Sequence, residues 1–277
     1  MRLEPIIMSN SFINLLAMAL YLSVGYLLWR DLRRGARTAG SARLAIFALA
    51  SGAVLLHGAI LYSGFLRENA LDLGLTNAIS LAAWAMALIF LIAALTRPIE
   101  SLGVLIMPVA ALTLLGEWLW PVGHRLIQNS TPLSSAHIVI SLLAYSLLGV
   151  AVVQSLMLAW QQRQLRSHQP SRFLRSLPPL EAMESLMFSM IGLGFLLLTL
   201  TLVSGIFFSE SYGQVLRLNH HIVLSLISWV VFAVLLLGRW RLGWRGRTAL
   251  HWTWSGFALL ALAYFGTKFV LDVVLHR

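Results

Sequence analysis

The sequence predicts an all-α integral membrane protein, a bundle of eight transmembrane helices with both the N- and C-termini outside. Of its 277 residues, 59% are hydrophobic and only 11% are charged, and the mean hydropathy is +0.82. Soluble domains carry about 25% charged residues, so this composition favours a chain embedded in lipid. No polar stretch is long enough to form a soluble domain, and we therefore expect a single transmembrane domain over residues 1–277.

Eight apolar runs have lengths close to the roughly 20 residues that a helix needs to cross the hydrocarbon core. The expected spans are Phe12–Trp29, Leu44–Leu66, Leu75–Thr96, Leu102–Trp120, Ser134–Trp160, Ser185–Phe208, His221–Gly238 and Ala249–Val274. Pro98 ends the third span, since the residue before a proline disfavours the helical conformation. Ser134 or Ser135 is expected to cap the fifth. The first run lacks a small-residue cleavage site, so we expect a retained helix rather than a signal peptide.

The basic residues orient these spans. Fourteen of the 20 lie in the loops after the first, third, fifth and seventh spans: Arg30, Arg33, Arg34, Arg37, Arg43, Arg97, Arg163, Arg166, Arg172, Arg175, Arg239, Arg241, Arg245 and Arg247. The positive-inside rule puts these loops in the cytoplasm and both termini outside. Because the basic residues lie in short loops between apolar runs, the formal charge of +10 indicates membrane topology, and no nucleic-acid partner is expected.

The chain contains no cysteine, which excludes disulfides, thiolate metal sites and a cysteine nucleophile. No nucleophile–base pair or phosphate-binding loop stands out, so we do not expect an enzyme. The small residues at Gly192–Gly194 are interpreted as a site of close helix packing in lipid.

The predicted orientation sorts the histidines by depth. His137 opens the fifth span and His220 and His221 open the seventh, so they lie at matching depth on the outer side, where His276 also falls. Imidazole is a good axial ligand for haem iron, and a bis-histidine site needs two rings that converge from different helices. The spacing therefore permits a haem at the outer leaflet. His57 lies deep in the second span, where an ionisable group is a functional candidate by default.

Structural alternatives remain open for each of these residues. A histidine at a membrane interface can be a polar anchor, and His57 can donate a hydrogen bond to a neighbouring carbonyl. Glu117, next to Trp118, is expected in an aromatic belt with its carboxylate in water. Tyr145, eight residues after His137, could lie on the same helix face or in the core.

Three sequence blocks carry a family resemblance. They are HIVISLLAYSLLGVAVVQSLMLAWQQRQL from His137, LPPLEAMESLMFSMIGLGFLLLTLTLVSGIFF from Leu177 and HHIVLSLISWVVFAVLLLGRWRLGWRGRTALHWTWSGFALLALAYFG from His220. They resemble the cytochrome c assembly membrane family, the haem-handling proteins of CcmC/CcsA type, and within it the YpjD/HemX-like branch. The resemblance is strongest over residues 133–277, and SLISW and GWRGR are its most specific pieces.

The resemblance implies a haem-binding, multi-pass protein of the bacterial inner (plasma) membrane that presents or holds haem b at the outer face. His137 matches the outer axial histidine of the family, and His57 resembles a histidine that some members use for a second haem. The family pattern points to His276 as the other outer ligand, whereas the spacing favours His220 or His221. Expected partners are membrane lipid and other membrane proteins of haem or cytochrome biogenesis.

One departure from the family motivates an alternative. Cytochrome c assembly members carry a tryptophan-rich WGxxWxWD segment before the penultimate helix, where this chain reads SESYGQVLRLNHH. The alternative is a haem-free accessory or regulatory membrane subunit of a transporter, for example of divalent cations.

Overall fold

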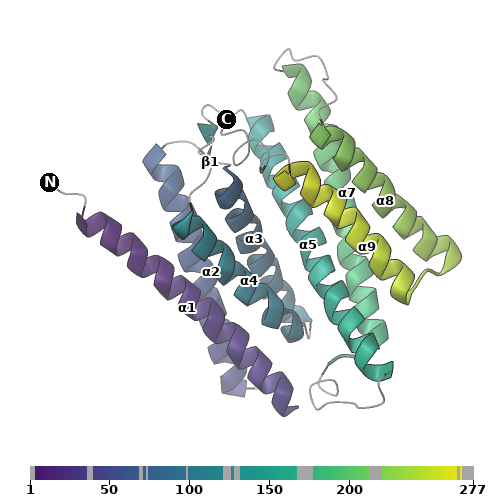
Figure 1. Cartoon of the computed structure of the whole chain (residues 1–277), viewed down its shortest axis with the longest axis horizontal. Helices are drawn as coiled ribbons and strands as arrows, with labels where there is room; N and C mark the ends of the chain where they lie inside the picture. Colours follow the sequence, from purple (N-terminus) through teal and green to yellow (C-terminus); the bar gives the residue numbers. More distant parts are fainter. Residues whose placement is uncertain are drawn as a thin grey trace. The chain divides into compact units, whose positions relative to one another are not determined.

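The computed structural model describes residues 4–35, 40–68, 71–72, 74–97, 99–120, 126–127, 132–166, 177–211, 220–266 and 269 (Figure 1). Its helices are α1 (Glu4–Arg34), α2 (Gly40–Glu68), α3 (Leu75–Thr96), α4 (Glu100–Leu119), α5 (Pro132–Arg166), α7 (Leu180–Ser211), α8 (His220–Leu242) and α9 (Gly246–Ala261). A π-helical turn, η1 (Leu262–Gly266), continues α9, and the two-residue strands β1 (Leu71–Asp72) and β2 (Leu126–Ile127) pair antiparallel.

The prediction of an all-α membrane protein is confirmed. Eight α-helices form within the described residues, and seven of them are long and apolar enough to cross a membrane. The eighth, α9, has 16 residues before its backbone changes to the π-helical η1. The β1–β2 pair is the small addition that the hydropathy pattern did not predict. That both termini lie outside, and that residues 1–277 form one domain, stay predictions.

The helices differ from the predicted spans mainly at their ends. The third span was predicted to the residue as Leu75–Thr96, but α5 and α7 extend well into the segments predicted as polar loops. Polar residues end a hydropathy signal without ending the hydrogen-bond ladder of a helix. The capping role predicted for Ser134 or Ser135 is wrong, because α5 already begins at Pro132 and Ser134 is buried in its first turn.

The chain divides into two compact units. In the first, α1 packs against α2 and α4, and α3 packs against the same two helices. Small residues permit this close approach: a Cβ added at Gly25 of α1 would lie 3.1 Å from the ring of Pro108 in α4. Arg43 of α2 reaches both Ala94 O at 3.0 Å and Glu100 at 3.3 Å, which ties the start of α2 to α3 and α4.

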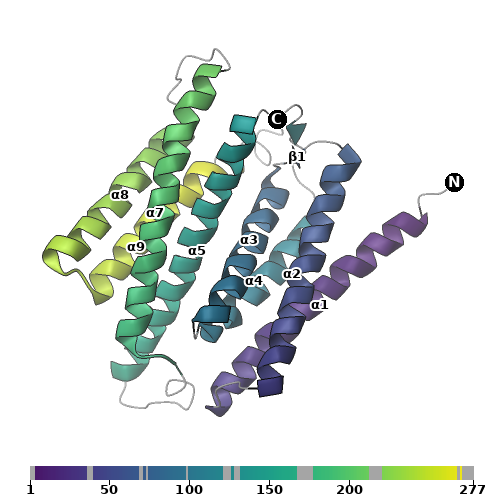
Figure 2. The same ribbon diagram turned by 180° about the vertical axis from the view of Figure 1, so that it is seen from behind.

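The second unit contains α5, α7, α8, α9 and η1, with α5 and α7 side by side (Figures 1 and 2). The SLISW motif lies in α8 and reaches its neighbours through polar groups. Ser228 Oγ donates to Gly256 O of α9 at 2.7 Å, and Trp229 Nε1 donates to Thr199 Oγ1 of α7 at 2.8 Å. The residues that carry the family resemblance here are therefore those that join α8 to its neighbours.

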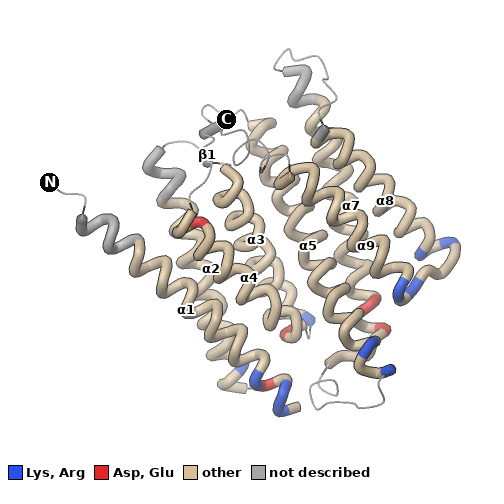
Figure 3. Tube along the Cα trace, viewed as in Figure 1, with Lys and Arg blue, Asp and Glu red and all other residues tan. Residues whose placement is uncertain are grey.

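Arginine residues gather near one end of the helices within each unit (Figure 3). In the second unit the α8–α9 turn, which contains the GWRGR motif, is held by Glu184 of α7. The amide of Gly246 donates to Glu184 Oε1 at 3.2 Å, and Arg239 lies 3.7 Å from the same oxygen. Gly243 and Gly246 have φ of 67° and 57°, so this turn needs glycine at both positions.

The interpretation of Gly192–Gly194 as a packing site holds for one of its two glycines. A Cβ at Gly194 would come within 2.7 Å of Leu148 of α5, whereas a Cβ at Gly192 would meet nothing within 4 Å. We predict that Gly194→Val lowers the thermal unfolding midpoint in detergent, because Leu148 must move, at a cost of about 1–3 kcal/mol. Gly192→Val, on the same helix, is the matched control. Equal effects of the two substitutions would contradict this packing argument.

Candidate functional site

The structure describes the surroundings of three of the five predicted cofactor-binding histidines. His57 lies in α2 of the first unit, and His137 and His221 lie in α5 and α8 of the second. His220 is the first residue of α8, but its side chain lies outside the described part, as does the whole of His276. The surroundings of His57 can therefore be described within the first unit, and those of His137 and His221 within the second.

His57 is fully buried, and both of its ring nitrogens have a partner. Nδ1 lies 3.2 Å from the hydroxyl of Tyr21 in α1, and Nε2 lies 2.9 Å from Ser80 Oγ in α3. A neutral imidazole offers one donor and one acceptor, and two hydroxyls satisfy both. The ring thus joins α1, α2 and α3. In this conformation it could ligate iron only if Tyr21 or Ser80 gave way.

His137 lies in the second turn of α5, half-buried against α7, and its Nδ1 is 2.9 Å from Ser204 Oγ. Ser204 donates its only hydroxyl hydrogen to Thr201 O in its own helix, at 3.1 Å. With the hydroxyl hydrogen placed on Thr201 O, the oxygen of Ser204 accepts, and Nδ1 of His137 is then the ring nitrogen that carries the hydrogen. Nε2 then carries the lone pair that can ligate a metal, because the hydrogen bond at one ring nitrogen selects the role of the other.

Two further contacts in the second unit show the same arrangement of hydroxyl groups. Thr199 donates to Phe195 O and accepts from Trp229 Nε1, and Ser155 donates to Val152 O and accepts from Trp254 Nε1. In each case the hydroxyl bonds back to its own helix and presents its oxygen to an N–H of a neighbouring helix. The indole N–H can only donate, so these pairs support the same assignment at His137.

His221, in the first turn of α8, is close enough to His137 for an electrostatic interaction between the two rings. It is the more exposed of the two. Gly205 of α7 faces the same ring, since an added Cβ would lie in van der Waals contact with its Cε1, at 3.4 Å. Three helices therefore contribute to this site: α5 and α8 each supply an imidazole, and α7 supplies the hydroxyl that bonds His137.

An aromatic group lies along α5 beyond His137. The Tyr145 hydroxyl donates to Leu260 O at 3.2 Å and interacts with Ser225 of α8. Tyr264 and Phe265 of η1 stand edge-on to its ring, with centroids 5.9 and 6.2 Å away. Tyr145 thus supports α9 just before its backbone changes to the π-helical η1, a type of segment that is frequent at functional sites.

The donor set fits a haem iron better than a bare metal ion. Among the described residues, no group of three or more His, Cys, Asp or Glu side chains could hold a metal ion. A haem iron already has four porphyrin nitrogens and needs only axial ligands, for which imidazole is well suited. His137 and His221 each offer an imidazole for this role from a different helix. His57 does not in this conformation, since hydroxyl groups occupy both of its nitrogens.

The sequence reasoning missed Ser204, which bonds His137 Nδ1, and Gly205, which lies against the His137 ring. A signal was present: both lie near the outer end of the sixth predicted span, at the depth assigned to His137. It also missed Tyr21 and Ser80 as partners of His57. No sequence spacing reveals these two, because they lie on different helices and meet His57 only after packing.

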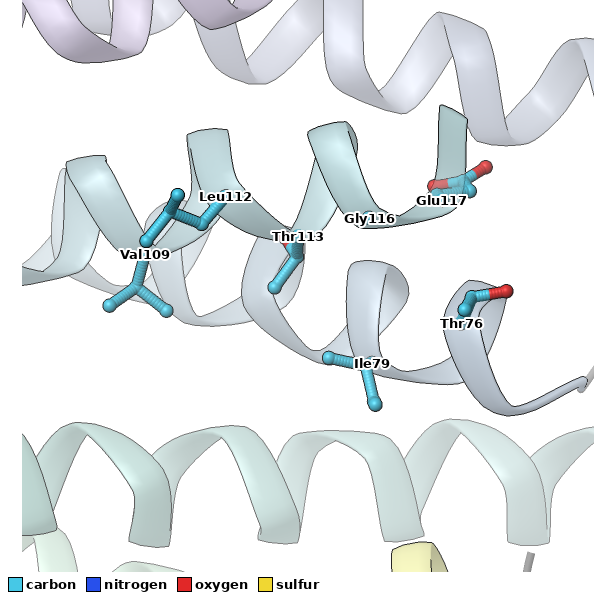
Figure 4. A pocket seen from close by; sticks show the side chains of 7 residues that line it. All are labelled: Thr76, Ile79, Val109, Leu112, Thr113, Gly116 and Glu117. Atoms are coloured by element: carbon cyan, nitrogen blue, oxygen red, sulfur yellow. The ribbon is translucent and has the colours of Figure 1, made fainter. Parts of the chain in front are cut away.

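The first unit has a separate groove between α3 and α4, of about 240 Å³ (Figure 4). Its lining is largely apolar, and Thr76 and Glu117 lie together at one end. Glu117, expected in water among belt tryptophans, is half-buried instead. The groove is smaller than the usual 300–1,000 Å³ of a ligand pocket and contains no histidine. It does not add to the histidine site.

Comparison with known proteins identifies the family. The model of the cytochrome c assembly protein family matches residues 45–275. The chain is 32% identical over 234 residues to the inner membrane protein YpjD of Escherichia coli K12, covering 83% of this chain and 86% of that protein. It is 35% identical over 211 residues to an uncharacterized 28.8 kDa protein of Azospirillum brasilense, covering 73% and 76%.

A shorter match links the chain to a cytochrome c biogenesis protein. The cytochrome c biogenesis protein CcsA of Gloeothece citriformis is 32% identical over 103 residues, covering 37% of this chain and 31% of that protein. Together with the seven apolar spans, the likeness to YpjD makes this a multi-pass protein of the bacterial inner membrane. With a family model that matches most of its length, the chain belongs to the cytochrome c assembly protein family.

Proposed function

We propose that this protein binds haem b in the inner membrane, with His137 and His221 as its axial ligands, and that it handles haem for cytochrome c assembly. The observation that carries the proposal is the hydrogen bond between His137 Nδ1 and Ser204, which would leave Nε2 as the ligating nitrogen. Membership of the cytochrome c assembly family supports a haem-handling role, as does the likeness to a cytochrome c biogenesis protein.

The two histidines would contribute unequally. His137 is half-buried and held by Ser204, whereas His221 is exposed at the start of α8. One firmly oriented ligand and one more accessible ligand suit a protein that must both retain haem and release it. We propose that this site lies at the outer face, in line with the arginine distribution. The bound haem b would supply an iron with two axial positions for these imidazoles.

We propose binding rather than catalysis. Ser204 gives its hydrogen to Thr201 O, so it orients His137 and is not activated as a nucleophile. His57 is left out of the ligand set because Tyr21 and Ser80 occupy its nitrogens. His220 and His276 remain the alternatives to His221. The partners would be membrane lipid and other membrane proteins of haem or cytochrome biogenesis.

The first test is the visible spectrum of the full-length protein purified in mild detergent, oxidised and then reduced with dithionite. Near-stoichiometric haem with a sharp reduced α-band is the expected result, since two imidazoles give a six-coordinate iron. A pyridine haemochrome assay identifies the haem as type b and gives the stoichiometry. A protein that shows no Soret band even after haem is supplied would overturn the proposal.

Substitution of the ligands separates the histidines. We predict that His137→Ala abolishes haem retention and that His221→Ala removes the sharp α-band, because the iron loses one axial nitrogen. His251→Ala, at an exposed position of α9, is the matched control and should keep the wild-type spectrum. If His221→Ala retains that spectrum, His220 or His276 is the second ligand. Undiminished haem in His137→Ala would contradict the assignment of His137.

Removal of the orienting hydroxyl tests the role of Ser204. We predict that Ser204→Ala weakens haem binding about 10- to 100-fold, the usual cost of losing a partner of a ligating histidine. The reduction potential should shift as well, which a purely structural role would not cause. Ser204→Thr keeps the hydroxyl and should restore both properties. Haem titration measures the affinity and spectroelectrochemistry measures the reduction potential. If both are unchanged in Ser204→Ala, Ser204 does not orient the ligating ring.

A further inference from the structure

The α8–α9 turn combines a fixed backbone with outward-facing arginines. Glu184 holds the turn through the Gly246 amide and Arg239. Arg239 is turned inward: it donates to Trp244 O at 3.3 Å and lies 4.6 Å from the centroid of the Phe188 ring. One of the four arginines of this turn is thus used to hold it in place.

Arg241 and Arg247, unlike Arg239, do not contact Glu184. Both are exposed, and within the described part of the chain neither has an acidic partner. Arg245 is also exposed, but it lies 3.8 Å from Glu181 and 3.9 Å from Glu184. Within the described residues, two glutamates thus accompany the four arginines of this turn, which leaves an excess of positive charge on its exposed surface.

Large apolar side chains lie directly beside this charge. Trp240 is 75% exposed and Leu242 is 71% exposed, and the Arg241 guanidinium lies 4.5 Å from the centroid of the Trp240 ring. Both apolar residues are at the end of the α8 span, where tryptophan marks the level of the lipid headgroups. The exposed side chains at the α8–α9 turn, Trp240, Arg241, Leu242 and Arg247, therefore combine positive charge with apolar area near the membrane interface.

We propose that this surface, the α8–α9 basic rim, binds the phosphate groups of anionic phospholipids. Guanidinium groups match phosphate oxygens in charge and hydrogen-bond geometry. Trp240 and Leu242 would contact the glycerol and acyl region, which a soluble acidic partner does not offer. Arg241 and Arg247 are separated by a tight turn, so a lipid with two phosphates, such as cardiolipin, can engage both. The proposal is independent of the haem site.

The test is lipid binding by the full-length protein in detergent, measured by native mass spectrometry with cardiolipin, phosphatidylglycerol and phosphatidylcholine. The double variant Arg241→Gln/Arg247→Gln should bind cardiolipin about ten- to thirty-fold more weakly, since each arginine near an anionic surface accounts for roughly a factor of five. Binding of phosphatidylcholine should not change. Trp240→Ala should also weaken cardiolipin binding, although it removes no charge.

Arg33→Gln/Arg34→Gln is the matched control. These residues are exposed in the last turn of α1, and Arg33 lies 4.7 Å from the Trp29 ring centroid, so the same charge is lost in a similar setting. An equal loss of cardiolipin in the control would mean diffuse attraction and would overturn the proposal. So would unchanged binding in the Arg241 and Arg247 variant, or displacement of cardiolipin by millimolar inorganic phosphate. The thermal unfolding midpoint shows that each variant is folded.

Discussion

The hydrogen bond that a hydroxyl makes back to its own helix is the interaction on which the second unit depends. Hydrocarbon offers no partners to polar groups, so each must be satisfied within the protein. Ser155, Thr199 and Ser204 each give their hydrogen to a carbonyl three or four residues earlier and accept from a ring N–H of another helix. Two of these contacts hold tryptophans and the third orients His137, so packing and the candidate haem ligand follow from one arrangement.

The same requirement distinguishes His57 from His137. Tyr21 and Ser80 satisfy both nitrogens of His57, which makes this ring a link between the helices of the first unit. At His137 the hydroxyl of Ser204 selects one nitrogen as the donor, and the neighbouring histidine on α8 offers a second imidazole. The two side chains are chemically the same, so the difference between them comes from the hydrogen-bond partners that surround each ring.

Much of the fold could be predicted because hydropathy is a local property. The boundaries of α3 were correct to the residue, and all eight predicted spans correspond to helices. The ends of α5 and α7 were not predicted, since a helix continues through polar residues as long as its backbone hydrogen bonds persist. The alternating direction of successive spans predicted that His137 lies near the start of α8. It did not reveal that Ser204 and Gly205 contact His137, or that Glu184 holds the α8–α9 turn.

The sequence by itself determined the membrane class, the order of the helices and the family resemblance, and it predicted that His137 and the His220/His221 pair lie at one depth. These depend on composition, periodicity and the direction of successive spans, which are readable along one chain. Only the tertiary structure decided which hydroxyl faces which histidine, which arginine turns inward to Glu184 and which glycine meets Leu148. Those outcomes depend on the rotation of each helix about its axis, and packing between helices sets that rotation.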